Sequence, residues 1–148
     1  MQIDEPALVP DLNDPARRAF ETAYGTLSSA AGLKLLLTTY FGAIGDNLDL
    51  VLRLPVAGLH LDLVCAPAQL EDVLAKAPTD VILSLGVVDG RNICRTDLNA
   101  VLDRIEPVVK QRGADKVMLA PSCSLLHVPV DLDLESELDV DLRSWLAF

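Results

Sequence analysis

The segment MLAPSCSLLHVP, residues 118–129, places a cysteine between two serines directly after an apolar run, with a histidine four residues further on. A thiolate and an imidazole can serve as zinc ligands, or as nucleophile and base. The pair Cys123 and His127 is a weak zinc pattern, because compact zinc motifs contain several paired ligands. Cysteine catalysis is also weakly indicated, since the chain has only two histidines and no nucleophile-elbow motif. Other residues must therefore decide the role of Cys123.

A second group of chemically capable residues follows other apolar runs. His60 and Asp62 are two positions apart, so they share one face of a strand and could form a metal pair or an acid–base pair. We favour a third interpretation, a hydrogen-bonded pair that closes a layer of side chains. Asp89, Arg91 and Asn92 follow a later run, where any strand end meets water. We take all five as candidate ligand-binding residues and predict no catalytic residue.

Five short apolar runs, rich in β-branched residues and leucine, alternate with segments of helical period. The runs cover residues 1–9, 34–41, 56–64, 80–88 and 116–124. This alternation predicts an α/β fold with parallel strands and crossover helices. Four βα repeats of this length are typical of about half of a (βα)8 barrel, and a small doubly wound sheet is the alternative. No G-x-G-x-x-G follows a run, which weakens a dinucleotide-binding interpretation.

Capping signals place the helices between these runs. Asp14 is expected to cap a helix that begins at Pro15 and ends at Gly32, and Thr96 to cap a later one. The other expected helices cover about 47–54, a segment from Pro67 onward, and about 134–148. We therefore expect residues 1–148 to form a single, partial domain.

Composition excludes several classes of function. Twelve basic against 22 acidic residues give a formal charge of −10, which disfavours binding to nucleic acid or to an anionic membrane. No apolar run reaches the ~18–20 residues of a membrane span, and the acidic N-terminus does not resemble a signal peptide. Three widely spaced cysteines, Cys65, Cys94 and Cys123, do not suggest a disulfide framework. A reducing, cytoplasmic location is the expectation.

Long strings of the sequence resemble one known family. QIDEPALV, KLLLTTYFG, LPVAGLHLDLV, SLGVVDGRNICRTDL and APSCSLLHVPVDL occur in that order and are similar to the amino-terminal domain of cobalamin-independent methionine synthase. The resemblance implies an enzyme of methionine biosynthesis with two (βα)8 barrels, which transfers a methyl group from 5-methyltetrahydropteroyltriglutamate to homocysteine. This chain resembles the second half of the amino-terminal barrel. It would scaffold the active-site cleft and be inactive alone.

The resemblance also implies a role for Cys123. The carboxy-terminal barrel of the family carries the zinc, and the corresponding positions of this chain are Thr39, Phe41, Asp62 and Cys123. Thr39 and Phe41 stand where that barrel has a histidine and a cysteine, and neither is a good zinc ligand. We therefore expect no metal and no cofactor in this segment, with zinc confined to the other barrel. Cys123 would be a relic that packs as a small apolar group.

The implied partners follow from the missing parts. They are the first half-barrel and the carboxy-terminal barrel, with folate and homocysteine bound only by the full enzyme. Open strand edges of a half-barrel could also support a homodimer. Two other functions stay open: a free-standing half-barrel module for binding or oligomerisation, and a small independent enzyme that uses the polar residues at the barrel mouth.

Overall fold

Strands and helices alternate along the computed structural model, which describes residues 1–128 and 131–147. The strands are β1 Gln2–Asp4, β2 Leu36–Thr38, β3 Gly58–Asp62, β4 Ile82–Val88 and β5 Val117–Pro121. The α-helices are α1 Asp14–Ser28, α2 Leu48–Val51, α3 Gln69–Lys76, α4 Leu98–Arg112 and α5 Val140–Trp145. Short 3-10 helices lie at Pro6–Leu8, Gly45–Asn47, Ala114–Lys116, Leu125–His127 and Leu132–Leu134.

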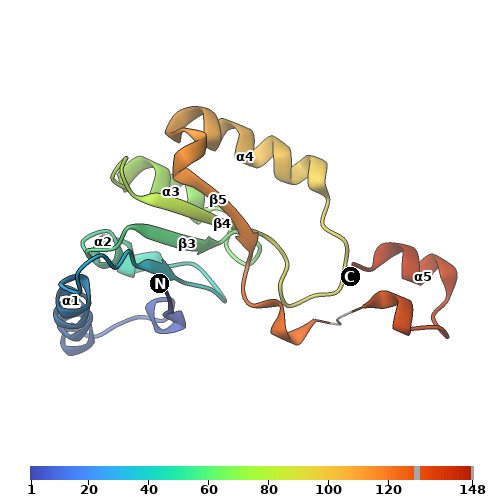
Figure 1. Cartoon of the computed structure of the whole chain (residues 1–148), viewed down its shortest axis with the longest axis horizontal. Coiled ribbons are helices and arrows are strands. Elements are labelled where there is room, and N and C mark those ends of the chain that lie inside the picture. The colour runs from blue at the N-terminus through green and yellow to red at the C-terminus, as the bar shows by residue number, and fades with distance from the viewer. Residues whose placement is uncertain (129–130, 148) are drawn as a thin grey trace.

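The strands form one sheet in the order β1-β2-β3-β4-β5, and every neighbouring pair is parallel. Helices α1 to α4 each connect two consecutive strands and lie along one side of the sheet (Figure 1). The predicted α/β fold with crossover helices is confirmed. A doubly wound sheet would reverse its strand order, whereas this sheet grows in one direction, as half of a (βα)8 barrel does.

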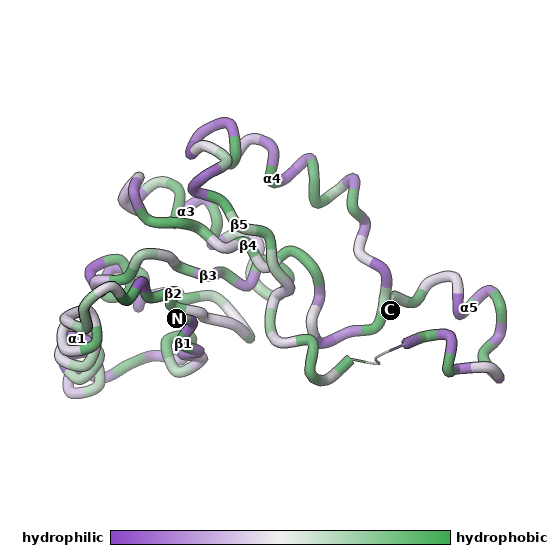
Figure 2. The backbone as a smooth tube through the Cα atoms, viewed as in Figure 1, coloured by the Kyte–Doolittle hydropathy of each residue, from purple (hydrophilic) through white to green (hydrophobic). Residues whose placement is uncertain are grey.

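Alternate residues of the strands build the core beneath the helices. Leu37, Leu59, Leu61, Leu83 and Leu85 are at most 1% exposed. Successive side chains of a strand point to opposite faces, so these leucines share the helix-covered side. Figure 2 shows the matching pattern, with hydrophobic residues concentrated in the central strands and alternating with hydrophilic ones along α4.

Two predicted caps are wrong by one residue. The Asn13 side chain, not that of Asp14, accepts a hydrogen bond from the amide of Ala16 at 2.9 Å. At α4 the cap is Asp97 rather than Thr96. In both cases the capping residue is the last one with an extended ψ, which lets its side chain turn back to the free amides of the first turn.

Other predicted helices are shorter in the structure. The first ends at Ser28, because the chain leaves helical geometry before Gly32 takes its left-handed φ of 75°. The second is α-helical only over Leu48–Val51 and follows a 3-10 turn. None of the helices in the two described ranges has the length and apolar content that crossing a bilayer requires.

Residues 131–147 form an arm that extends away from the sheet (Figure 1). The predicted helix over 134–148 is present only as α5, because Asp139 caps a new helix start. The arm returns to the segment after β4 through an antiparallel bridge between Cys94 and Leu146. Its core contribution is small, since Leu134 and Val140 are 76% and 81% exposed.

Candidate functional site

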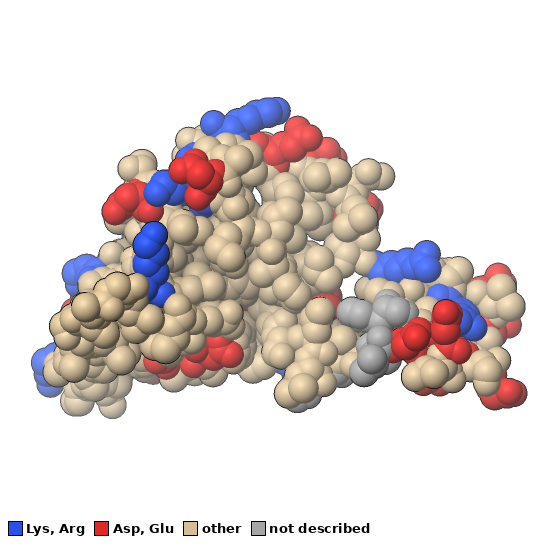
Figure 3. Space-filling model, in the orientation of Figure 1, with Lys and Arg blue, Asp and Glu red and all other residues tan. Residues whose placement is uncertain are grey.

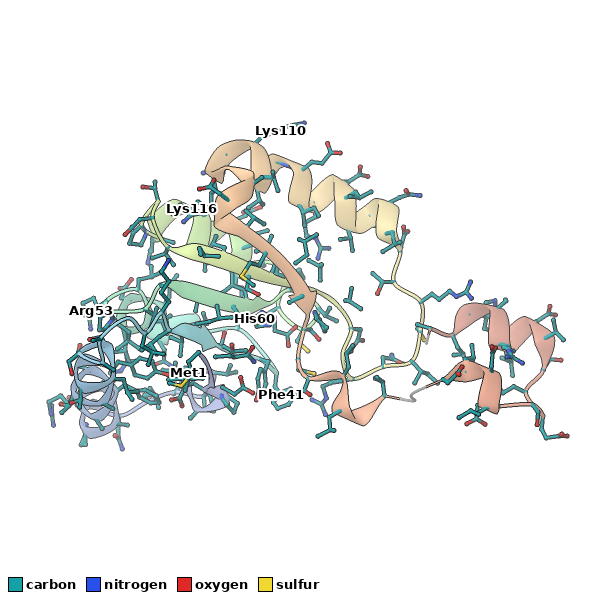
Figure 4. All side chains as sticks on the ribbon, in the orientation of Figure 1. Met1, Phe41, Arg53, His60, Lys110 and Lys116 are labelled. Atoms are coloured by element: carbon teal, nitrogen blue, oxygen red, sulfur yellow. The ribbon has the colours of Figure 1, made fainter. Side chains whose placement is uncertain are left out.

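The carboxyl ends of the parallel strands bring four polar turns to one edge of the sheet. They contain the predicted residues of 39–41, Asp62, 89–92 and 122–124. This is the edge at which parallel α/β proteins place their ligands. Figure 4 shows His60 beside the strands and Phe41 further toward this edge.

Asp62 is the centre of the hydrogen bonds at this edge, and it is 1% exposed. Its Oδ2 accepts the amide of Phe41 at 3.0 Å. Its Oδ1 accepts the amides of Val64 and Cys65 at 3.1 and 2.9 Å. Three backbone donors therefore occupy the carboxylate, which joins the turn after β2 to the turn after β3. An incoming ligand would have to displace these bonds.

Phe41 has an unusual backbone and an exposed ring. Its φ is 76°, in the left-handed region that a bulky side chain rarely adopts, and the hydrogen bond from its backbone N–H to Oδ2 of Asp62 stabilises this conformation. The guanidinium carbon of Arg91 lies 4.7 Å from the ring centroid, within cation–π range. The Tyr40 ring packs edge-on at 4.6 Å between centroids. The position predicted to match a zinc ligand thus carries an aromatic platform.

Three of the other predicted polar side chains form hydrogen bonds with backbone groups. Thr39 is fully buried and donates its hydroxyl to the carbonyl of His60 at 2.9 Å. Asp89 accepts the amide of Arg91 at 2.9 Å, and Asn92 accepts that of Ile93 at 2.8 Å. The structure brings Asp62, Phe41 and Arg91 into one connected group, whereas Asp89 and Asn92 stabilise their own turns.

His60 does not pair with Asp62, contrary to our interpretation of their spacing. Its Nε2 lies 3.3 Å from the carbonyl of Ser122, and its Nδ1 lies 2.9 Å from Oγ of Ser84. A carbonyl only accepts, so Nε2 carries the proton and Nδ1 accepts the Ser84 hydroxyl. Burial lowers the pKa of His60, although the Ser122 carbonyl and the Asp62 charge oppose that shift. A neutral, structural imidazole is the result.

Cys123 is a packed thiol, 8% exposed. A Cβ added at Gly90 would lie 3.0 Å from its sulfur and 2.6 Å from its carbonyl oxygen, so the two segments meet closely. Burial raises the pKa of Cys123, which keeps the thiol protonated and weakly nucleophilic. Within residues 1–128 and 131–147 no three His, Cys, Asp or Glu side chains converge as a metal site requires. The side chain of His127, its weak predicted partner, lies outside what the structure describes.

Ser84 is a contact residue that the sequence interpretation missed. Ser84 interrupts the apolar run 80–88, and this interruption is the one signal that could have marked it. Its partner His60 is 24 residues away, and Ser122 is 62 residues from His60. Only strand register brings such distant residues together.

Comparisons with known proteins give a consistent family. The family model for the N-terminal domain of cobalamin-independent synthase matches residues 1–113. Proteins named 5-methyltetrahydropteroyltriglutamate–homocysteine methyltransferase are similar over all of this chain: 64% identical in Rhodopseudomonas palustris, 64% in Nitrobacter winogradskyi and 59% in Caulobacter vibrioides. The chain spans only 19% of the length of each of these relatives.

One solved structure shares the fold. It is described as a vitamin-B12-independent methionine synthase from Listeria monocytogenes, with a TM-score of 0.60 at 18% sequence identity. The match covers 84% of this chain and 41% of that protein.

Proposed function

This chain belongs to the cobalamin-independent methionine synthase family, and from that premise we propose that it is a scaffolding segment of such an enzyme. The relatives that cover it are named for methyl transfer from 5-methyltetrahydropteroyltriglutamate to homocysteine. In this proposal residues 1–148 form the second half of the amino-terminal barrel. The rest of the polypeptide supplies the other half-barrel, the catalytic barrel with its zinc, and the binding of folate and homocysteine in the cytoplasm.

The bonding of Asp62 is the observation that carries this proposal. Its two carboxylate oxygens receive three backbone amides and fix the loops after β2 and β3. Phe41 at the neighbouring position offers no donor atom to a metal, and the Cys123 thiol is packed against Gly90. Residues used in this way shape the mouth of a barrel, and none of them is free to activate a thiol.

A chimera tests the proposal directly. The chain would replace the corresponding 149 residues of the Rhodopseudomonas palustris relative, to which it is 64% identical. A scaffold should preserve methyltransferase activity in the chimera, and Cys123→Ser should leave that activity within about twofold, because a packed thiol touches no reacting atom. A folded chimera that loses activity through Cys123→Ser alone would show that the sulfur acts in the chemistry.

Zinc titration of the chain alone gives an independent test. With a competing chromophoric chelator, we expect no stoichiometric tight binding, because zinc requires about four converging ligands. The matched control is Cys123→Ser, which should give the same curve. One tight zinc per chain that Cys123→Ser removes would contradict the proposal.

An oligomerising half-barrel module is the second candidate, and the open edge at β5 supports it. Met118 and Leu119 of this strand are 48% and 57% exposed. A groove of about 470 Å³ runs between β5 and α4, lined by Leu98, Leu102 and other apolar residues. Figure 3 shows that the middle of this face carries few charged side chains, which lie instead around its margins, including α4 and the arm. Light scattering decides: a dimer that Leu119→Lys converts to monomer supports this function, and a stable monomer rejects it.

A further inference from the structure

The groove between β5 and α4 lies at the last strand of the sheet, on the side that the helices cover. Every residue that lines it is apolar, and Leu98, Leu102 and Leu119 are 65%, 49% and 57% exposed. Exposed apolar patches of this kind mark places where another element packs. The groove belongs to the outer layer of helices, so a further strand that paired with β5 would lie beside it without filling it.

The repeating pattern of the fold indicates which element belongs in this groove. Helices α1 to α4 each follow one strand and lie along the same side of the sheet (Figure 1). In a (βα)8 barrel the helix after every strand joins this outer layer. The α-helix after β5 is α5, and among the α-helices of the described residues it alone lies away from the sheet (Figure 1). The groove is therefore the position that the pattern assigns to α5.

Helix α5 has an exposed apolar face and is tied to one end of the groove. Leu142 and Trp145 are 46% and 63% exposed, and their spacing of three residues places them on the same face of the helix. The amide of Arg95 donates to the carbonyl of Trp145 at 2.8 Å, and Arg95 lies three residues before Leu98, which lines the groove. The end of α5 is thus fixed beside the start of α4. Rotation about that point can bring Leu142 over the groove.

We propose that α5 closes over the groove when another strand pairs with β5. This inference rests on the proposed function, in which the other half-barrel supplies that strand. A crossover helix packs on its own strand and on the next one, whereas this chain offers α5 a surface on β5 and α4 alone. Contacts on half of that surface do not repay the ordering of a six-residue helix, so α5 stays away from the sheet. Pairing at β5 completes the surface, and Leu142 then packs against Leu102 and Leu119.

Thiol labelling tests this by comparing the chain alone with the chimera that carries it in the Rhodopseudomonas palustris relative. Leu142→Cys is introduced into both proteins, and its reaction with a maleimide is followed by mass spectrometry. Digestion after Glu137 separates position 142 from Cys123. We expect labelling at position 142 to be about tenfold slower in the chimera, because a docked helix must open before the thiol reacts. Equal rates in the two proteins would overturn the proposal.

The matched control for labelling is Val140→Cys. Val140 is 81% exposed and lies two residues from Leu142, on the opposite face of α5. It should react equally fast in the chain and in the chimera. Equal slowing at positions 140 and 142 would show that the whole arm is covered by another part of the enzyme, and would reject docking of one face in the groove.

A charge in the groove shows whether α5 docks there. Leu98→Lys places a charge at an exposed position of the groove and should restore fast labelling of Leu142→Cys in the chimera. Asn99→Lys changes the next residue of α4, which is exposed outside the groove, and should leave labelling slow. Slow labelling that Leu98→Lys does not change would reject the groove as the docking site. Methyltransferase activity verifies that each chimera is folded. An active chimera with fast labelling at position 142 rejects this inference alone, whereas an inactive parent chimera rejects the proposed function and this inference with it.

Discussion

Two adjacent rows of the same sheet differ completely in their environment. One row runs through Ile3, Leu37, Leu59, Leu83 and Val117, and the next, one residue further along every strand, through Asp4, Thr38, His60, Ser84 and Met118. The central leucines of the first row are at most 1% exposed and lie beneath the helices. The second row faces a cavity of about 330 Å³ on the opposite side of the sheet. Moving one residue along a strand therefore leads from a side chain in the core to one that faces the cavity, because side chains alternate with a period of two.

This difference indicates how the two rows contribute to stability. The leucine row stabilises the folded state because it removes apolar surface from water, which is the dominant favourable term in folding. The polar row buries two hydroxyls and an imidazole, and within the described part of the chain the Thr38 hydroxyl gains no hydrogen bond in return. Substitutions in matched positions of the two rows should separate these contributions.

Leu59→Ala should have the largest effect. Leu59 is 1% exposed at the centre of the sheet, so its truncation leaves a cavity and should lower the free energy of unfolding by about 3 kcal/mol. Met118→Ala in the polar row, where the side chain is 48% exposed, should lower it by less than about 1 kcal/mol. Urea denaturation measures both. Equal losses would mean that the two faces contribute alike to the core.

Asp62→Asn sharpens the comparison. The Asp62 side chain points to the same side of the sheet as the polar row, but its carboxylate binds backbone amides and so stabilises the fold. An asparagine retains one acceptor and turns N–H donors toward backbone amides, so we expect a loss of about 2 kcal/mol. Asp89→Asn affects one local bond and should cost less than about 1 kcal/mol. Denaturation midpoints compare the two. A small effect at Asp62 would show that its three bonds contribute little.

Thr38→Val and Thr39→Val should have opposite signs. Among the residues that the structure describes the buried Thr38 hydroxyl has no partner, so valine should raise the free energy of unfolding by about 1 kcal/mol. The Thr39 hydroxyl donates to the His60 carbonyl, so valine should lower it by about 1 kcal/mol. Thermal and urea unfolding of the two variants test this. Destabilisation by both would indicate that Thr38 already has a partner in solution.

The fold was accessible from the sequence because its signals are local. Apolar runs such as 80–88 and the helical spacing between them predict strands and helices without knowledge of distant contacts. The caps were each misplaced by one residue, because Asn13 and Asp14, or Thr96 and Asp97, are both good capping types. Only the backbone dihedral angles distinguish them.

The site could be predicted from the sequence only in part, because it is built from contacts between residues that are far apart in the sequence. Position matching identified Thr39, Phe41, Asp62 and Cys123, but not what each one contacts. The bonds of His60 to Ser84 and Ser122 depend on the register of three strands. The left-handed backbone of Phe41 depends on the carboxylate of Asp62, 21 residues away. Spacing along a single strand contains neither fact.

The smallest expected difference between the two rows is in the slope of the free energy of unfolding against pH. Burial lowers the pKa of His60 in the folded state below its ordinary value of 6.5, so below about pH 6.5 the unfolded chain binds a proton that the folded chain does not. The free energy of unfolding should therefore fall as the pH decreases from about 7 to about 5.5, and less steeply in His60→Gln. His127 is present in both proteins and contributes equally to both slopes. Identical slopes in urea titrations at each pH would mean that the imidazole titrates as it does in water, and that the polar row is far more hydrated than the leucine row beside it.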